Sequence, residues 1–165
     1  MAQVWLVTGS SRGLGRAIVE AGLAAGNKVL ATARGIESLA DLPERYGDQV
    51  KLFALDVTDE AAAANAVMSA IDLFGSLDVV INNAGYGNLS SIEDTPLSEF
   101  RAQIETNLFG TIIVTKAALT YFREKKQATS FSFRRWAEGS ALRDVGLIRR
   151  RNGVSKAFLK CCHAK

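Results

Sequence analysis

The sequence predicts an α/β protein with a doubly wound parallel sheet, truncated after about the fourth strand. Three observations predict it. Short apolar stretches alternate with segments of helical periodicity over residues 1–128. The apolar stretches are continuous instead of alternating with polar residues, as expected of parallel strands buried on both faces. The connections between them are short, which favours right-handed βαβ units in one sheet.

The predicted elements follow in order along the chain. Runs rich in β-branched residues predict strands at 4–7, 28–33, 50–55 and 78–81. Apolar residues at helical spacing predict a first helix that ends before Gly26-Asn27. The same spacing predicts three further helices, over 36–46, 58–74 and 98–122. Pro43 interrupts the second helix, so we expect regular helix only before Leu42. We expect Thr58 to cap the third helix, with Gly75 after its last residue.

Composition is that of a soluble globular protein. The chain has 165 residues, of which 48% are hydrophobic and 8% aromatic, and no apolar run approaches the ~20 residues of a membrane-spanning helix. The first residues lack the basic and apolar regions of an export signal. Cys161 and Cys162 are adjacent, which gives neither a disulfide framework nor metal-ligand spacing. We therefore expect a cytoplasmic protein with no metal and no membrane contact.

Residues 129–165 differ from the rest in charge and pattern. Residues 1–128 carry 11 Lys and Arg against 15 Asp and Glu, a net charge of −4, whereas residues 129–165 carry 9 against 2, a net charge of +7. Thr129–Phe133 is a possible strand, but arginines interrupt every later apolar run. The tail is open to three interpretations: a basic patch for nucleic acid, a metal site at Cys161, Cys162 and His163, or a segment not selected together with the rest. No recognition fold accompanies the basic residues, so we expect no nucleic-acid partner.

A glycine-rich turn lies between the first predicted strand and the first predicted helix. Glycines allow positive φ and close approach of the backbone to a pyrophosphate, and a helix N-terminus offers free N–H groups to it. The last glycine of the turn lets the helix pack close to the strand. This context favours a dinucleotide site over an ordinary loop. The residues of the candidate site are Gly9, Ser10, Ser11, Arg12, Gly13, Leu14 and Gly15.

Four motifs together resemble the short-chain dehydrogenase/reductase family. They are TGSSRGLG at 8–15, LDV at 55–57, NNAG at 82–85 and ETN at 105–107. The resemblance implies that residues 1–128 form a partial Rossmann-like domain that binds NAD(P). It also implies that Asp56 and Val57 lie beside the adenine and that Asn107 takes part in catalysis. The residues that it places in the floor of the cofactor site are Asn83, Ala84 and Gly85.

The end of the second predicted strand favours NADP over NAD. NAD-binding proteins of this kind place a carboxylate there, which accepts from the ribose 2′-hydroxyl and repels a 2′-phosphate. Here the strand ends Thr32-Ala33-Arg34, without an acid. Arg34 and Arg12 both suit bidentate contact with a 2′-phosphate, since a guanidinium matches phosphate geometry. The alternative is that both are solvated surface arginines.

The catalytic set implied by the resemblance is incomplete. The family uses a tyrosine as acid and base, a lysine four residues later that lowers its pKa, and a serine that orients the substrate oxygen. The chain has three tyrosines, Tyr46, Tyr86 and Tyr121, and none lies in the expected region. We therefore predict that the tyrosine–lysine pair is absent and that Asn107 is the remaining catalytic residue.

The genetic code offers an account of residues 129–165. They can be back-translated with codon choices that, read from one base earlier, encode the family's SSVGG strand end and its YQAAK helix start. The serine, tyrosine and lysine would then fall at Arg135, Ile148 and Asn152. We therefore interpret 129–165 as a frameshifted basic tail outside the family, which also explains the change in charge.

The sequence thus predicts descent from an NADP-dependent oxidoreductase that interconverts a small secondary alcohol and a ketone by hydride transfer. The chain itself is expected to be inactive. The alternative is a catalytically dead nucleotide-binding fragment or the product of a misread gene. Intact relatives usually form homo-oligomers, and we expect that this chain does not.

Overall fold

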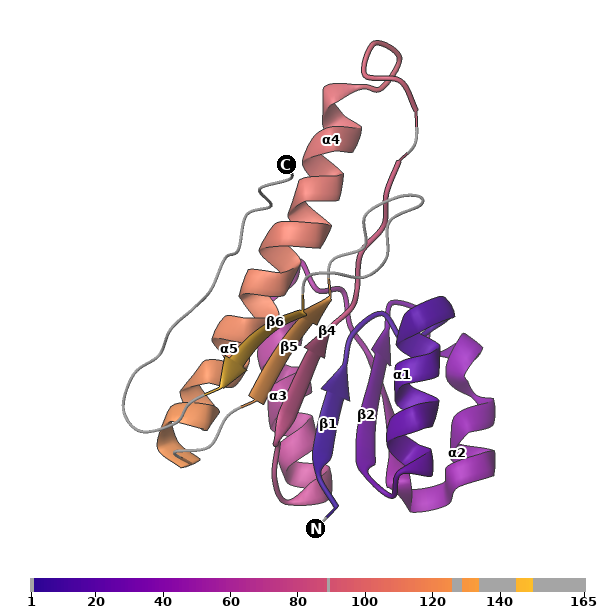
Figure 1. The fold of residues 1–165 in the computed structure, drawn as a ribbon, viewed down its shortest axis with the longest axis vertical. Coiled ribbons are helices and arrows are strands. Elements are labelled where there is room, and N and C mark those ends of the chain that lie inside the picture. The colour runs from indigo at the N-terminus through magenta and orange to yellow at the C-terminus, as the bar shows by residue number, and fades with distance from the viewer. Residues whose placement is uncertain (1, 89, 126–128, 134–144, 150–165) are drawn as a thin grey trace.

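A computed structural model (Figure 1) describes residues 2–88, 90–125, 129–133 and 145–149. Its centre is one sheet with the strand order β3-β2-β1-β4-β5-β6. All neighbouring strands are parallel except β5 and β6, which are antiparallel. The strands are β1 (Val4–Val7), β2 (Lys28–Ala33), β3 (Val50–Ala54), β4 (Val79–Asn82), β5 (Thr129–Phe133) and β6 (Val145–Arg149).

Helices cover both faces of the sheet, because successive strand residues point to opposite sides. Leu6 packs in one core, with buried residues of α3 and α5, whereas its neighbour Val7 packs in the other, with residues of α1 and of the segment that includes α2. Figure 1 shows these two helical layers on either side of the strands. The helices are α1 (Gly13–Ala24), α2 (Asp41–Tyr46), α3 (Glu60–Phe74), α4 (Leu97–Ile104) and α5 (Gly110–Lys125).

The predicted fold class is confirmed, and the first four strands lie where the sequence places them to within one residue. Beyond these, β5 coincides with the possible strand at 129–133 and pairs with β4. The sequence pattern predicts no regular element at Val145–Arg149, yet this segment pairs antiparallel with β5. Strand pairing satisfies backbone N–H and C=O groups whatever the side chains, so a weak apolar pattern does not exclude it.

Two helix starts differ from the sequence expectation for local reasons. Pro43 does not end the second helix: it is the third residue of α2, where a backbone N–H would have no helical partner anyway. Asp59, and not Thr58, caps α3, with its Oδ1 accepting from the Ala62 N–H at 2.9 Å. The Thr58 hydroxyl and N–H instead donate to the Asp56 carboxylate.

The predicted long helix over 98–122 is three consecutive helical segments. A π-helical turn, Glu105–Phe109, separates α4 from α5. Such wide turns carry one residue more than an α-helical turn and often occur at functional sites. Among the helices that the structure describes, none has the length and hydropathy needed to cross a bilayer.

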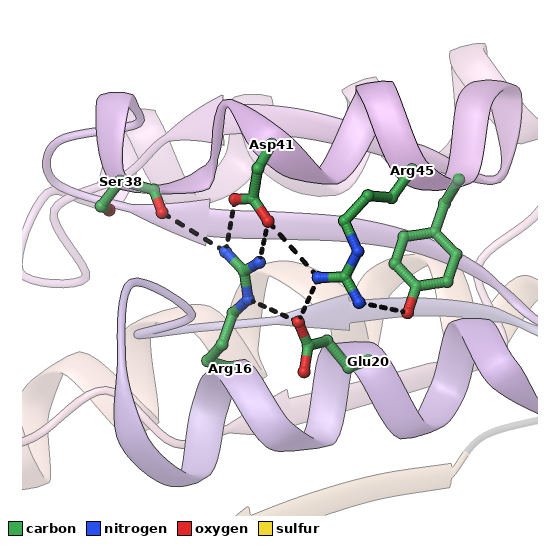
Figure 2. A network of polar contacts seen from close by, with 6 residues as sticks. Arg16, Glu20, Ser38, Asp41 and Arg45 are labelled. Carbon is green, nitrogen blue, oxygen red and sulfur yellow. Dashed lines mark hydrogen bonds and ion pairs between the residues drawn. The ribbon is translucent and has the colours of Figure 1, made fainter.

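A charged cluster joins α1 to α2 and consists of Arg16, Glu20, Asp41 and Arg45 (Figure 2). Arg16 forms two hydrogen bonds with Asp41, and its Nε lies 3.1 Å from Glu20 Oε1. Arg45 Nη1 donates to the same Glu20 oxygen at 2.8 Å. The hydrogen bond from Arg16 is the main cause that lowers the pKa of Asp41, and the one from Arg45 is the main cause that lowers the pKa of Glu20.

These lowered pKa values predict a loss of stability in acid. A carboxyl whose folded-state pKa is depressed stabilises the fold above its unfolded pKa, and this contribution disappears as the pH falls through the folded pKa. Between about pH 5 and pH 3 the urea midpoint of the protein should therefore fall more steeply than that of a Glu20→Gln/Asp41→Asn variant. The control is Glu44→Gln, on α2 but outside the charged cluster. Parallel pH profiles for the protein and the double variant would contradict the prediction.

Candidate functional site

The candidate site lies where the chain changes direction across the sheet. From β1 the chain builds outward through β2 and β3, and it then returns to place β4 on the other side of β1. In parallel sheets, ligands bind in the crevice at such a switch point, beyond the carboxyl ends of the strands. The glycine-rich turn follows β1 and residues 83–85 follow β4, so both predicted segments meet at this point.

Gly9 brings these two segments into contact. Its φ is +67°, a conformation that other residues rarely adopt. A Cβ on Gly9 would lie 2.7 Å from the Ala84 Cα, closer than real side chains come to backbone. A Cβ on Gly15 would collide with the Gly9 carbonyl and with the Asn83 side chain. The glycines therefore serve close packing of loop, helix and β4, as the sequence predicts for Gly15.

Thr8 is the polar centre of this contact, and sequence reasoning did not assign it a role. Its buried Oγ1 accepts from the N–H groups of Asn83 and Ala84, both at 3.0 Å. The Asn83 side chain in turn donates from Nδ2 to the carbonyls of Thr8 and Gly9, both at 3.1 Å. The signal was present in the sequence, because the motif at 8–15 begins with this threonine.

Ser10 and its neighbours divide between the core and the surface. The Ser10 hydroxyl is buried and donates to the Val7 carbonyl at 2.9 Å, so this side chain supports the turn from within. Ser11 is half-buried, whereas Arg12 and Leu14 are exposed at the start of α1, the position of the predicted phosphate contact. Gly13 has φ of +58°, and a Cβ there would meet open space.

Arg34 and Asp56 lie at the same edge of the sheet. Ala33 pairs with Ala54, and the Leu55 N–H donates to the Ala33 carbonyl at 2.9 Å, so the residues that follow β2 and β3 are neighbours. Arg34 is exposed. Hydrogen bonds from the Thr58 N–H and hydroxyl lower the pKa of Asp56, with a further contribution from the charge of Arg34. Asp56 is therefore a carboxylate at neutral pH.

Val57 faces the interior, in contrast to Asp56. It is 6% exposed and belongs to the core between α3 and α5. A Cβ on Gly110 would lie 2.5 Å from the Val57 Cγ2, so α5 approaches this residue closely. The side chain therefore packs α5 against the segment after β3.

Asn107 sits within the π-helical turn and holds the chain after β4. Its Oδ1 accepts from the Tyr86 N–H at 3.0 Å, and its Nδ2 donates to the Tyr86 carbonyl at 2.7 Å. Gly85 completes the contact, because a Cβ there would lie 2.9 Å from the Asn107 Oδ1. The structure therefore brings together the predicted residues 83–85 and Asn107, which are remote in sequence.

One tyrosine does have a lysine four residues later, which corrects the sequence prediction that this pair is absent. Tyr121 and Lys125 both lie in α5, and the Lys125 ammonium is 5.8 Å from the centre of the Tyr121 ring. At about 1.5 Å per residue, Tyr121 is roughly 20 Å along the helix from Asn107. In Figure 1 this end of α5 lies toward the edge where the strands begin. The pair is therefore remote from the candidate site.

Most of the residues named by the hypotheses for the C-terminal tail lie outside what the structure describes. Arg135 and Asn152, where the serine and lysine of the alternative reading frame would fall, lie beyond the described residues. So do Cys161, Cys162 and His163 of the metal alternative. Ile148, where the tyrosine would fall, is part of β6.

Comparison with known proteins gives a consistent result. The sequence profile described as "short chain dehydrogenase" matches residues 3–129. An "Oxidoreductase BOA17" from Botryotinia fuckeliana is 48% identical over 132 residues, which cover 79% of this chain and 48% of that protein. An uncharacterized oxidoreductase, YusZ, from Bacillus subtilis is 38% identical and covers 74% of this chain and 45% of its own length. The chain spans about half the length of the curated relatives it matches.

Solved structures share the fold. A short-chain dehydrogenase from Streptomyces avermitilis superposes with a TM-score of 0.75 at 39% identity, over 80% of this chain and 49% of that one. A structure described as ElxO with NADP bound gives a TM-score of 0.74 at 28% identity, over 80% and 55% of the two chains.

Proposed function

The chain belongs to the short-chain dehydrogenase family, and from this premise we propose that residues 1–128 form the NADP-binding part of an oxidoreductase that interconverts a secondary alcohol and a ketone. The observation that carries the proposal is the contact of Gly9 with Ala84 at the switch point of the sheet. This contact fixes the turn beside the start of α1, where backbone N–H groups would approach a pyrophosphate. The NADP-bound relative ElxO supports the choice of nucleotide.

The residues present fit NADP. Gly9 and Gly13 have positive φ, which suits a turn that binds phosphate through its N–H groups. Two exposed arginines, Arg12 and Arg34, flank the start of α1 and the end of β2, and no carboxylate follows β2 directly. A guanidinium at that position favours a 2′-phosphate, whereas a carboxylate would favour the free hydroxyl of NAD. Asp56 and Val57 would border the adenine.

The chain's own residues orient the reaction. When bound, NADPH would supply the hydride for reduction of the ketone, and NADP⁺ would accept it in oxidation of the alcohol. Asn83, through its hydrogen bonds to Thr8 and Gly9, fixes the floor on which the nucleotide rests. Asn107 holds the backbone at Tyr86 and thereby keeps the segment after β4 at the edge of the site. Asn107 thus lies beside the segment that follows β4, at the switch point of the sheet, and this position supports a catalytic role for it in the family reaction.

A second candidate is a nucleotide-binding module without turnover. One specific observation favours it: the only tyrosine in the sequence with a lysine four residues later, Tyr121, lies at the far end of α5. Without a proton donor beside the nicotinamide, the general acid–base contribution of about 10²–10⁴ in rate is lost. The binding function does not need this donor, because the contacts proposed for the adenosine end lie in residues 9–57.

Cofactor preference tests the proposal. We expect the chain to bind NADPH more tightly than NADH, with an NADPH affinity that falls as salt rises, since arginine–phosphate contacts are partly screened. Arg34→Asp should reverse the preference, because a carboxylate repels the phosphate and accepts from the free hydroxyl. Both affinities are measured by titration of nucleotide fluorescence. The matched control is Arg123→Asp, the same charge change at an exposed position near the end of α5. Equal affinities for the two nucleotides, unchanged by Arg34→Asp, would refute the proposal.

A further inference from the structure

The segment that follows Arg34 is held by contacts from a different helix. Directly after β2 the Ser38 hydroxyl donates to the Gly35 carbonyl at 3.3 Å, and the Leu39 N–H donates to the Ile36 carbonyl at 2.9 Å. These bonds make residues 35–39 one compact turn, with Leu39 fully buried beneath it. Arg34 itself is exposed, so the position of its guanidinium depends on the backbone of this turn.

Arg16 of α1 forms hydrogen bonds with this turn and with the start of α2. Its Nη1 donates to the Ser38 carbonyl at 3.3 Å and to Asp41 Oδ1 at 3.0 Å, while its Nη2 bonds the second Asp41 oxygen. Its Nε donates to Glu20 at 3.1 Å. Figure 2 shows the Arg16 guanidinium between Ser38, Asp41 and Glu20. All three nitrogens of the guanidinium are therefore engaged within the protein, which leaves Arg16 poorly placed to bind phosphate itself.

Arg16 also connects the two ends of the proposed nucleotide site. It directly follows Gly15, the glycine that packs against Gly9 and Asn83, so its backbone is anchored beside the pyrophosphate turn. Its side chain reaches the turn after Arg34, where the 2′-phosphate would lie. With 19% of its side chain exposed, it is the least exposed member of the charged cluster. The bidentate bond to Asp41 is the rigid form of arginine–carboxylate contact.

We propose that Arg16 is a positioning residue for nucleotide selection: by holding Ser38 and Asp41 to α1, it sets where Arg34 meets the 2′-phosphate. This inference rests on the NADP binding proposed above. Arg16 acts on the phosphate through the backbone of residues 35–41 and not through its own charge. Its loss should therefore affect NADPH, which carries the 2′-phosphate, and leave NADH nearly unchanged.

The test compares Arg16→Gln with Arg45→Gln in the full chain. Arg45 shares the partners Glu20 and Asp41, but its further hydrogen bond goes to the Tyr46 hydroxyl and not to Ser38. We expect Arg16→Gln to weaken NADPH binding roughly five- to tenfold, the effect of displacing one charge-assisted contact, and to change NADH binding less than about twofold. Arg45→Gln should leave the ratio of the two affinities within about twofold of its original value. Equal changes in both variants, or equal weakening of both nucleotides, would overturn the proposal.

A double variant separates position from charge. Arg16→Gln/Asp41→Asn removes the bidentate bond but keeps the net charge of the protein. If Arg16 acts by position, the double variant should discriminate between NADPH and NADH as poorly as Arg16→Gln does. Recovery of the original ratio would show that the unpaired Asp41 charge repels the phosphate, and the proposal would be wrong.

A second variant covers the case in which Arg16→Gln does not fold. If Arg16→Gln does not fold, Arg16→Lys replaces it, with an expected loss in NADPH affinity of about threefold, because lysine reaches one carboxylate oxygen but lacks the planar fork. An unchanged affinity ratio in Arg16→Lys would then overturn the positioning role. If the unaltered chain binds NADPH and NADH with equal affinity, the proposed preference for NADP is wrong. If the unaltered chain prefers NADPH and the Arg16→Gln variant shows the same preference, only the positioning role of Arg16 is wrong.

Discussion

The purified 165-residue chain is expected to show no NADP(H)-linked turnover of any secondary alcohol or ketone, whereas the product of a gene corrected by one base near codon 128 is expected to be active. The physical reason is the position of the Tyr121–Lys125 pair, which lies at the far end of α5 from the candidate site. Hydride transfer to a ketone leaves an alkoxide that must be protonated, and Tyr121 is roughly 20 Å along the helix from Asn107 at the ordinary rise per residue. In the proposed reading frame a serine, a tyrosine and a lysine would replace Arg135, Ile148 and Asn152.

The measurement is NADPH oxidation with a panel of aliphatic and aromatic ketones. The matched control is the corrected protein with its restored tyrosine changed to phenylalanine, which should lose about 10²–10⁴ in kcat while it still binds NADPH. A Tyr121→Phe variant of the corrected protein should keep full activity, because that ring packs on the far end of α5. Measurable turnover by the uncorrected 165-residue chain would contradict the hypothesis that residues 129–165 result from a frameshift.

The second large effect is expected at Gly9. Gly9→Ala should lower the free energy of unfolding by about 2–4 kcal/mol, since a positive φ costs an alanine about 1 kcal/mol and overpacking adds about 1–3. The added Cβ would lie 2.7 Å from Ala84 Cα, and backbone on the β4 side cannot yield without breaking the hydrogen bonds to Thr8. NADPH binding should be lost together with the geometry of the turn.

Gly26→Ala is the matched control for this variant. Gly26 has a comparable φ of +81°, but a Cβ there would meet nothing within 4 Å. It should therefore cost only the backbone strain of about 1 kcal/mol and leave NADPH binding intact. Urea unfolding and nucleotide titration of both variants make the comparison. Similar losses at the two glycines would show that the approach of Gly9 to Ala84 has no special role.

The parallel core and the meeting of residues 9–15 with 83–85 could be predicted from sequence, because both follow from local signals. Buried parallel strands appear as apolar runs, and their carboxyl ends necessarily share an edge. The contact between Arg16 and Asp41 could not be predicted in this way. It joins residues 25 positions apart, and it depends on how α1 and α2 are rotated about their axes on the sheet.

Tyr121 and Asn107 show a second reason why sequence alone falls short. The spacing of Tyr121 and Lys125 matches a catalytic pair, and the course of α5 shows that this pair lies toward the edge where the strands begin, away from the candidate site. For Asn107 the motif predicts a role in the site, but it does not predict that both ends of its amide bind the backbone of Tyr86. Tyr86 belongs to no apolar pattern and to none of the four motifs.

Because of the π-helical turn Glu105–Phe109, the geometry of this site depends on the number of residues between α4 and α5 as well as on their identity. Each residue advances an α-helix by about 100°, so one residue more or fewer between α4 and α5 would rotate one helix against the other by more than a quarter turn. Gly110 and Val114 would still pack against the core, but Asn107 would no longer face Tyr86. Insertions and deletions at this turn therefore remodel the site while every one of its residues is retained. When sequences related to this chain are compared, the number of residues between Ile104 and Gly110 is as informative as the identity of Asn107.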